Sequence, residues 1–331
     1  MQQRVLGKSG LKLSLLGFGC GAVGGLMVRG SPADQERAVA RAIELGINYF
    51  DTAAMYGQGQ SERHLGRVLK ALKPNVLVGT KVRVPPEEKG RIGAAIAASL
   101  EASLGRLGLD HVDLLQLHNH ITLAGHDDGL TTEQVLGEAV PAFERLRREG
   151  KTRFFGITAV GDTQALERVV EAGVFESAQV PYNILNPSAG AAVAAGYPAH
   201  DYKNLFARIE RAQMGVIAIR VLAAGALSGT EERHPLGSPS VEPIATGRDY
   251  KTDVERARRL EPLLREGHAA SLAEAAVRFA IAHRAVTTAL VGYSTQGQLE
   301  DAAAAVEKGP LSPAALLRLE ALRQGFAGEA R

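Results

Sequence analysis

The chain has 331 residues, of which 45% are hydrophobic and 22% charged, a composition that can bury a sizeable core. Its 38 basic and 36 acidic residues leave a net charge of +2, which gives no electrostatic reason to bind nucleic acid or a membrane surface. Cys20 is the only cysteine, which excludes an intrachain disulfide; because no stretch resembles a signal peptide or a membrane span, we expect a cytoplasmic location.

After an opening β-hairpin at residues 4–13, short apolar runs alternate with longer helical patterns. The predicted strands are residues 14–19, 48–50, 76–80, 112–117, 153–157, 177–180, 215–219 and 288–291. The helical patterns that follow them are residues 33–45, 61–72, 91–107, 132–149, 163–172, 205–212, 272–283 and 296–307, with an extra terminal helix at residues 313–323. Eight strand–helix units predict a single α/β domain over residues 1–331, a closed (β/α)8 TIM barrel with an N-terminal β-hairpin and an extra C-terminal helix.

Four residues of types that take part in catalysis follow successive predicted strands. Asp51 directly follows residues 48–50, Tyr56 lies five positions later, Lys81 follows residues 76–80, and His118 closes residues 112–117. Taken singly, each has a structural interpretation: a helix cap, a loop tyrosine, a solvated lysine and a core histidine. Because a parallel barrel directs the ends of its strands to one face, their joint spacing favours a single site.

These residue types together can transfer a proton. A free phenol has a pKa of about 10, and a nearby ammonium lowers that value by stabilising the phenolate. A carboxylate beside the ammonium holds it charged, and a histidine can hydrogen-bond a substrate oxygen. A phenol in this setting can donate a proton to a carbonyl oxygen or accept one from an alcohol.

Several motifs, in the right order over almost the whole chain, resemble those of the aldo-keto reductases. They are residues 51–62 with Asp51, Tyr56 and Ser61, residues 99–115, residues 150–158 and residues 179–183. The resemblance implies an oxidoreductase that moves hydride between a nicotinamide cofactor and an aldehyde, ketone or alcohol. It assigns Tyr56 as proton donor or acceptor, Lys81 as the group that tunes it, Asp51 as the partner of Lys81, and His118 as the residue that orients the substrate oxygen.

The resemblance also implies contacts to the nicotinamide. Thr158 and Gln179 match residues that hold its carboxamide, but Ala159 stands where an asparagine is usual. Ile219 takes the position of an aromatic residue that stacks on the ring in many members. Arg220 comes next, either as a contact to nicotinamide or pyrophosphate or as a salt-bridged strand end.

Residues 292–301 resemble the segment that binds the adenosine end, with phosphates near a helix N-terminus. The expected cofactor contacts there are Gly292, Tyr293, Ser294, Gln298 and Asp301. Gln298 replaces the usual arginine, and Asp301 would repel a 2′-phosphate, which calls for charged donors. No Arg or Lys occurs between Arg284 and Lys308, so we favour NAD(H) over NADP(H) unless Arg248 or Lys251 supplies the charge.

Two long connections, residues 119–130 and 222–250, are candidates for binding loops. The implied substrate contacts are Cys20 and Asn119. Trp is absent and aromatic residues make up 5%, whereas His118, His120, Asp127 and Asp128 supply polar groups. A sugar or another polyol suits such a pocket; the substrate and the oligomeric state stay open.

Three other interpretations compete with the reductase. A cofactor-binding regulatory module would resemble the potassium-channel β subunits. A metal-dependent hydrolase or lyase could use His118 and His120, which strand alternation aims at one side, although no carboxylate has a recognisable ligand spacing and we expect no metal. Residues 19–24 match the G-x-G-x-x-G pattern of a Rossmann fold, with Asp51 after the next strand, but no helical pattern begins until residue 33.

Overall fold

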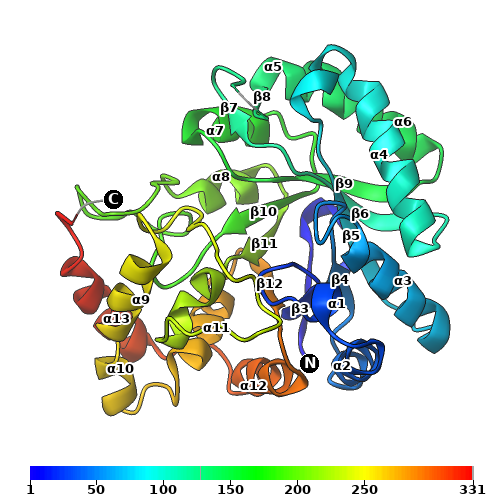
Figure 1. The fold of residues 1–331 in the computed structure, drawn as a ribbon. Helices are drawn as coiled ribbons and strands as arrows, with labels where there is room; N and C mark the ends of the chain where they lie inside the picture. The colour runs from blue at the N-terminus through cyan, green and yellow to red at the C-terminus, as the bar shows by residue number, and fades with distance from the viewer. Residues whose placement is uncertain (127, 330–331) are drawn as a thin grey trace.

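The computed structural model describes residues 1–126 and 128–329, and at its centre eight parallel strands close into a barrel (Figure 1). Around the barrel the strand order is β3, β4, β5, β6, β9, β10, β11 and β12. Their bounds are β3 Leu16–Gly19, β4 Tyr49–Asp51, β5 Leu77–Val82, β6 Val112–Leu117, β9 Thr152–Thr158, β10 Ser177–Pro181, β11 Gly215–Ile219 and β12 Val286–Gly292. The predicted (β/α)8 barrel is confirmed.

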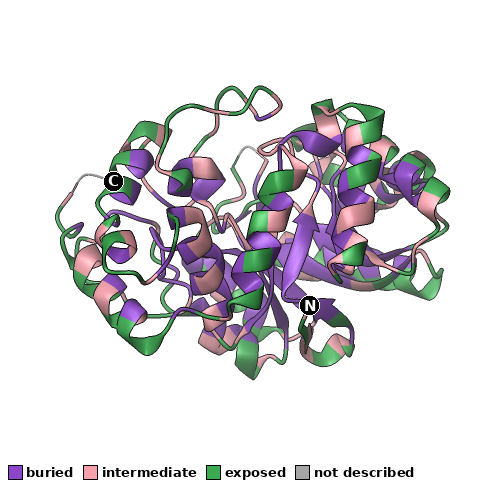
Figure 2. Ribbon diagram, turned by 90° about the horizontal axis from the view of Figure 1, so that it is seen from below, coloured by how far each residue is buried: buried purple, intermediate pink, exposed green. Residues whose placement is uncertain are grey.

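Helices surround this barrel and turn their apolar faces to it, so that Figure 2 shows buried strands inside partly exposed helices. The main ones are α2 Pro32–Glu44, α3 Gln60–Leu72, α4 Ile92–Leu107, α7 Thr163–Glu171, α8 Leu205–Arg211, α11 Leu272–Ala282 and α12 Gln296–Glu307. The extra terminal helix is α13 Pro313–Gln324, which lies beside α10 Pro262–Arg265 (Figure 1). Every helix of the described residues is too short or too polar to cross a bilayer.

One predicted helix is interrupted. Residues 132–149 form α5 Thr132–Gln134, a π-helical turn at Val135–Ala139 and α6 Val140–Arg148. Pro141 lies in the first turn of α6 and has no N–H to donate to the carbonyl four residues earlier. The π turn absorbs this break in the hydrogen-bond ladder.

Shorter elements connect these units. They are 3-10 turns at Gly7–Ser9, Pro86–Arg91 and Ala223–Ser228, helices α1 Leu26–Arg29 and α9 Tyr250–Arg258, and the paired strands β7 Ile121–Thr122 and β8 Leu130–Thr131. The residues between Ser228 and Tyr250, 229–249, are called the strap below because they cross over the loop that follows β3. Neither α1 nor α9 was predicted.

The N-terminal hairpin, β1 Gln3–Val5 and β2 Lys12–Ser14, closes one end of the barrel. Leu6, Leu11 and Leu13 pack with Tyr49 and Ile217 from the barrel strands in a second buried cluster. The predicted hairpin is thus confirmed, but the predicted strand 14–19 is too long by two residues. Ser14 belongs to β2, and the barrel strand begins only at Leu16.

The glycine-rich segment at residues 19–24 does not belong to a Rossmann fold, because its strand is part of the closed barrel. It leads directly into α1, contrary to our expectation that no helix follows closely. At Gly25, with φ +83°, a Cβ atom would lie 1.6 Å from the carbonyl oxygen of Leu236 in the strap. Only glycine therefore lets the strap pass this closely over the loop.

Removing hairpin side chains is expected to destabilise the barrel. Leu6→Ala empties space in the buried cluster and should lower the free energy of unfolding by about 2–5 kcal/mol. Leu317→Ala, at a position 68% exposed, is the matched control and should change it by less than about 0.5 kcal/mol. Urea unfolding followed by circular dichroism measures both free energies. Equal unfolding midpoints for Leu6→Ala and Leu317→Ala would mean that packing of the hairpin does not stabilise the barrel.

Candidate active site

A cavity of about 1070 Å³ opens at the C-terminal ends of the barrel strands. Asp51 ends β4, Lys81 lies within β5, His118 follows β6, and Tyr56 lies in the loop between β4 and α3. Asp51, Tyr56 and His118 line the cavity, and Lys81 contacts Asp51 beneath it. The structure thus brings together the four residues of the predicted tetrad.

Asp51 and Lys81 form an ion pair in which both side chains are 1% exposed. Lys81 Nζ donates to Asp51 Oδ1 and, at 2.8 Å, to the carbonyl oxygen of Thr52. The other carboxylate oxygen accepts from Tyr49 Oη at 2.8 Å and from Gln179 Nε2 at 2.6 Å. Burial works to lower the pKa of Lys81, but the Asp51 carboxylate and Tyr56 outweigh it and raise that pKa, so the lysine stays charged.

The charged lysine lies against the phenol. Lys81 Nζ is 4.8 Å from the centre of the Tyr56 ring, and the His118 ring meets that ring edge-on with 6.0 Å between centres. A positive charge at this position stabilises a phenolate relative to a phenol. The arrangement can therefore support proton exchange at Tyr56.

His118 is electrically neutral over the physiological range. Burial, followed by the charges of Lys81 and Arg83 and by His120, lowers the pKa of His118 to about 3. Among the described residues, its buried Nδ1 has no hydrogen-bond partner. A neutral imidazole retains one N–H donor and one acceptor, so it can hydrogen-bond a substrate oxygen without carrying charge.

The predicted nicotinamide contacts lie around the same cavity. Thr158, Gln179, Ile219 and Arg220 all line it. Thr158 Oγ1 is buried and has no partner among the described residues, whereas Gln179 is tied to Asp51. Arg220 adopts φ +56°, and its Nη1 donates to the carbonyl oxygen of Glu242 in the strap at 3.2 Å.

Ala159, which replaces the usual asparagine, is fully buried in the main core and is not among the described residues that line the cavity. Its backbone N–H donates to the carbonyl oxygen of Gln179 at 2.8 Å. The position therefore serves packing and strand pairing in this structure.

The predicted adenosine segment also lines the cavity, through Gly292, Tyr293, Ser294, Gln298 and Asp301. Ser294 fixes the segment, because its Oγ donates to the carbonyl oxygen of Gly24 at 2.6 Å. Gln298 Oε1 accepts from Ser294 N at 2.8 Å, so this side chain holds its own loop. Tyr293 is buried against Phe18, with 5.1 Å between ring centres, and burial raises its pKa.

The positions of Cys20 and Asn119 do not fit the predicted substrate contacts. Cys20 is 1% exposed in the main core, and neither residue is among the described residues that line the cavity. The side-chain amide of Asn119 is hydrogen-bonded within the protein. Its Oδ1 accepts from Val84 N, and its Nδ2 donates to the carbonyl oxygens of Val84 and Asp128. Spacing placed both residues near the site but could not reveal these competing partners. Asp127, another expected pocket residue, lies outside the described residues.

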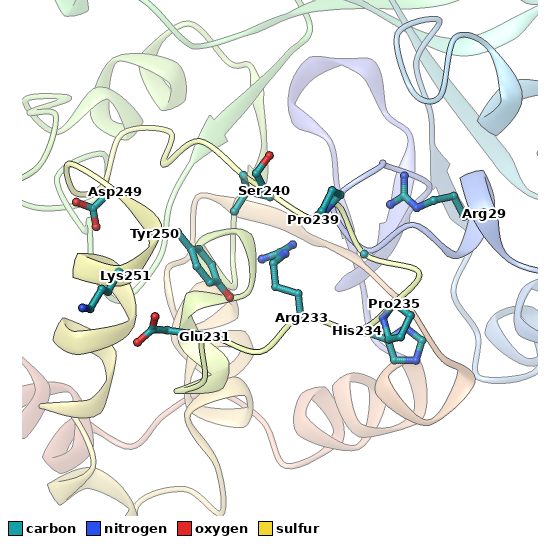
Figure 3. Close-up of a pocket in the computed structure, with 12 residues that line it drawn as sticks. Arg29, Glu231, Arg233, His234, Pro235, Pro239, Ser240, Asp249, Tyr250 and Lys251 are labelled. Atoms are coloured by element: carbon teal, nitrogen blue, oxygen red, sulfur yellow. The ribbon is translucent and has the colours of Figure 1, made fainter.

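The strap forms part of the cavity wall and borders a second cavity of about 780 Å³ (Figure 3). Arg233 packs over Tyr250, with 4.9 Å from its guanidinium carbon to the ring centre, and donates to the carbonyl oxygens of Ser238 and Ala224. Arg29, on the other side, donates to the carbonyl oxygen of Leu236. These bonds hold the strap across the loop after β3.

The basic residues that we proposed as donors for a 2′-phosphate lie elsewhere. Lys251 lines the second cavity, and Arg248 pairs with Asp249 at 3.1 Å. Neither is among the described residues that line the large cavity, whereas Arg83 and Arg233, which were not predicted, do line it. Strand alternation could have identified Arg83, because it lies two residues after Lys81 and so faces the same side.

A metal centre finds little support in the described residues, since no group of three or more His, Cys, Asp or Glu side chains among them could hold an ion. His118 and His120 both line the cavity, but no third His, Cys, Asp or Glu among the described residues is placed to hold an ion with them.

The comparisons with known proteins agree with this geometry. The model of the Aldo/keto reductase family matches residues 15–324. The chain belongs to the aldo-keto reductase family. It is 31% identical over 314 residues to L-galactose dehydrogenase of Arabidopsis thaliana. The match covers 92% of this chain and 88% of that protein.

A solved structure extends the match to the whole fold. The holo form of aldo-keto reductase AKR11C1 from Bacillus halodurans superposes with a TM-score of 0.71 and 27% identity, covering 100% of this chain and 98% of that one. The chain is also 33% identical over 165 residues to a putative voltage-gated potassium channel subunit beta of Schizosaccharomyces pombe. That match covers only 46% of this chain and 44% of that protein.

The buried ion pair predicts non-additive stability effects. Asp51→Asn and Lys81→Met each leave an uncompensated buried charge, and each should lower the free energy of unfolding by about 3–5 kcal/mol. The double variant leaves no such charge, so its loss should be smaller than the sum of the two. Urea unfolding midpoints of the two single variants and the double variant measure this difference. Lys151→Met, which removes the more exposed ion pair with Glu101, is the control. Additive losses would contradict the ion pair.

His118 predicts a pH-dependent stability. With a pKa of about 3 when folded and about 6.5 when unfolded, the unfolded chain binds the proton more readily between these values. The stability contribution is complete above pH 6.5 and is lost as the pH falls towards 3. Relative to His118→Gln, the native chain should therefore lose about 3 kcal/mol between pH 7 and pH 4. Denaturant titrations at both pH values test this, and His111→Gln, at an exposed position, should behave as the native chain.

Proposed function

We propose that this aldo-keto reductase is an NAD(H)-dependent enzyme that interconverts a carbonyl compound and its alcohol, with Tyr56 as the general acid and base. The observation that carries the proposal is the buried Asp51–Lys81 ion pair directly beneath the Tyr56 ring. A charged lysine held there by a carboxylate has a clear use only if the phenol exchanges a proton.

Each residue has one task in this mechanism. Tyr56 donates its hydroxyl proton to the carbonyl oxygen of the substrate, or takes the proton of an alcohol in the reverse direction. Lys81 stabilises the phenolate that results, and Asp51 keeps Lys81 charged and in place. His118, neutral at physiological pH, hydrogen-bonds the substrate oxygen and orients it towards Tyr56. The nicotinamide cofactor, when bound, supplies or accepts the hydride.

The cavity residues fit a nicotinamide dinucleotide. The orphaned hydroxyl of Thr158 gives a buried polar atom at the end of β9, close to the predicted tetrad. Ile219 and Arg220 border it at the end of β11, and Ser294 lies before the N-terminus of α12, where phosphates are favoured. We assign the nicotinamide to Thr158 and Gln179 and the adenosine end to residues 292–301.

The charge pattern at the adenosine end favours NAD(H). A 2′-phosphate needs free Arg or Lys donors, but residues 292–301 contain none, and Asp301 lines the cavity there. Lys308, the basic residue that follows, donates to Glu274 at 2.7 Å. Arg233 is occupied by carbonyl oxygens of the strap and its neighbours.

A sugar or polyol is the proposed substrate class. The cavity mouth carries Arg83, His120 and Asp128, which can hydrogen-bond hydroxyl groups. The plant relative named for L-galactose covers most of the chain, which supports a polyhydroxylated substrate.

Initial rates with NADH and NADPH against 4-nitrobenzaldehyde test the proposal, alongside Tyr56→Phe. The variant should lose about 10²–10⁴-fold in kcat because it has no proton to donate. Tyr197→Phe, which removes only a hydrogen bond to the carbonyl oxygen of Leu185, is the matched control and should stay active.

The cofactor arm of this experiment has its own outcome. Rates should be higher with NADH, and a preference for NADPH of more than about tenfold would overturn the assignment of the adenosine end. Tight binding of a nucleotide without turnover of any aldehyde would instead favour a regulatory module that resembles the channel β subunits.

A further inference from the structure

The mouth of the cavity contains an ion pair outside the predicted tetrad. Arg83, two residues after Lys81, pairs with Asp128 in the loop between β7 and β8. Their side chains are 33% and 23% exposed, and both line the cavity with Tyr56 and His118. The pair is therefore accessible to a substrate that reaches Tyr56.

A buried amide connects the two segments that carry this pair. Asn119 is 1% exposed and makes two hydrogen bonds of 2.8 Å with the backbone N–H and carbonyl oxygen of Val84, the residue next to Arg83. Its Nδ2 also donates to the carbonyl oxygen of Asp128 at 2.6 Å. One side chain thus ties together the two segments that carry the pair, which holds it in position before any ligand binds.

The charge of Arg83 acts on the site itself. It contributes to the lowered pKa of His118 after burial and Lys81, and to the lowered pKa of His120 after burial. Its Nη1 also contacts Met55 Sδ at 3.3 Å, in the loop that carries Tyr56. An unpaired cation here would attract anionic substrates towards Tyr56.

We propose that Asp128 is a specificity-determining residue that neutralises Arg83, so that the cavity accepts neutral polyhydroxylated substrates and disfavours anionic ones. This rests on the proposed function. The guanidinium donors and the carboxylate oxygens together can bind neighbouring hydroxyl groups, whereas a substrate carboxylate would have to displace Asp128 from Arg83. Asn119 acts as a positioning residue for the pair.

Two aldehydes of similar shape and different charge test this inference. The ratio of kcat/KM for 4-carboxybenzaldehyde to that for 4-nitrobenzaldehyde should rise about tenfold in Asp128→Asn, because Arg83 is then free to bind the carboxylate. Arg83→Met should lower the ratio, since Asp128 is left as an unpaired anion. In the double variant the ratio should no longer rise, because the Arg83 guanidinium is gone. Asp110→Asn, at an exposed position, is the control and should leave the ratio unchanged.

Equilibrium binding separates failure of this inference from failure of the proposed function. Calorimetry with 4-(hydroxymethyl)benzoate should show tighter binding to Asp128→Asn than to the native chain, and the difference should shrink with added salt. If no aldehyde is turned over, the proposed function fails and this titration alone decides the inference. An unchanged ratio or unchanged affinity in Asp128→Asn would overturn it. If that variant does not fold, Arg83→Met decides, and an unchanged ratio there overturns it equally.

Discussion

The buried ion pair between Asp51 and Lys81 is the constraint on which the rest of the site depends. Burying two charges costs several kcal/mol for each unless every remaining lone pair and proton finds a partner. Thr52, Tyr49 and Gln179 supply those partners from the chain itself. Room for the Tyr49 phenol exists because residue 79 is glycine, where a Cβ atom would lie 2.4 Å from Tyr49 Oη. The barrel interior is thus arranged around the carboxylate.

The cavity wall joins distant parts of the sequence. The strap passes over Gly25 and is held by Arg29, while Ser294 after β12 hydrogen-bonds Gly24 in the same loop. The loop after β3 therefore contacts both the strap and residues 292–301, the segment that we assign to the adenosine end of the cofactor. Movement of the strap would alter the wall of the cavity, because Arg220 is tied to the carbonyl oxygen of Glu242.

The sequence was sufficient to predict the barrel, the order of its strands and the meeting of the tetrad, because strand ends in a parallel barrel share one face. It was not sufficient to predict where loop side chains point. Asn119 and Gln298 lie at the positions expected for substrate and cofactor contacts, but each side chain hydrogen-bonds nearby backbone atoms. Sequence spacing carries no information about such partners. The π turn before α6 also escaped prediction, although Pro141 gave a local reason for it.

The basic side chains of the cavity follow one pattern. Arg83, Arg220, Arg233 and Lys308, which are all the Arg and Lys residues among the described lining residues, each interact with an acceptor within the chain. A cation that already has a partner offers little to a new anion unless that partner is displaced. Cations that already have partners therefore support both proposals: a dinucleotide without a 2′-phosphate and an uncharged polyhydroxylated substrate. The lack of Arg and Lys in residues 292–301 and the internal partners of Arg233 and Lys308 both support the first proposal. The Asp128 carboxylate on Arg83 supports the second.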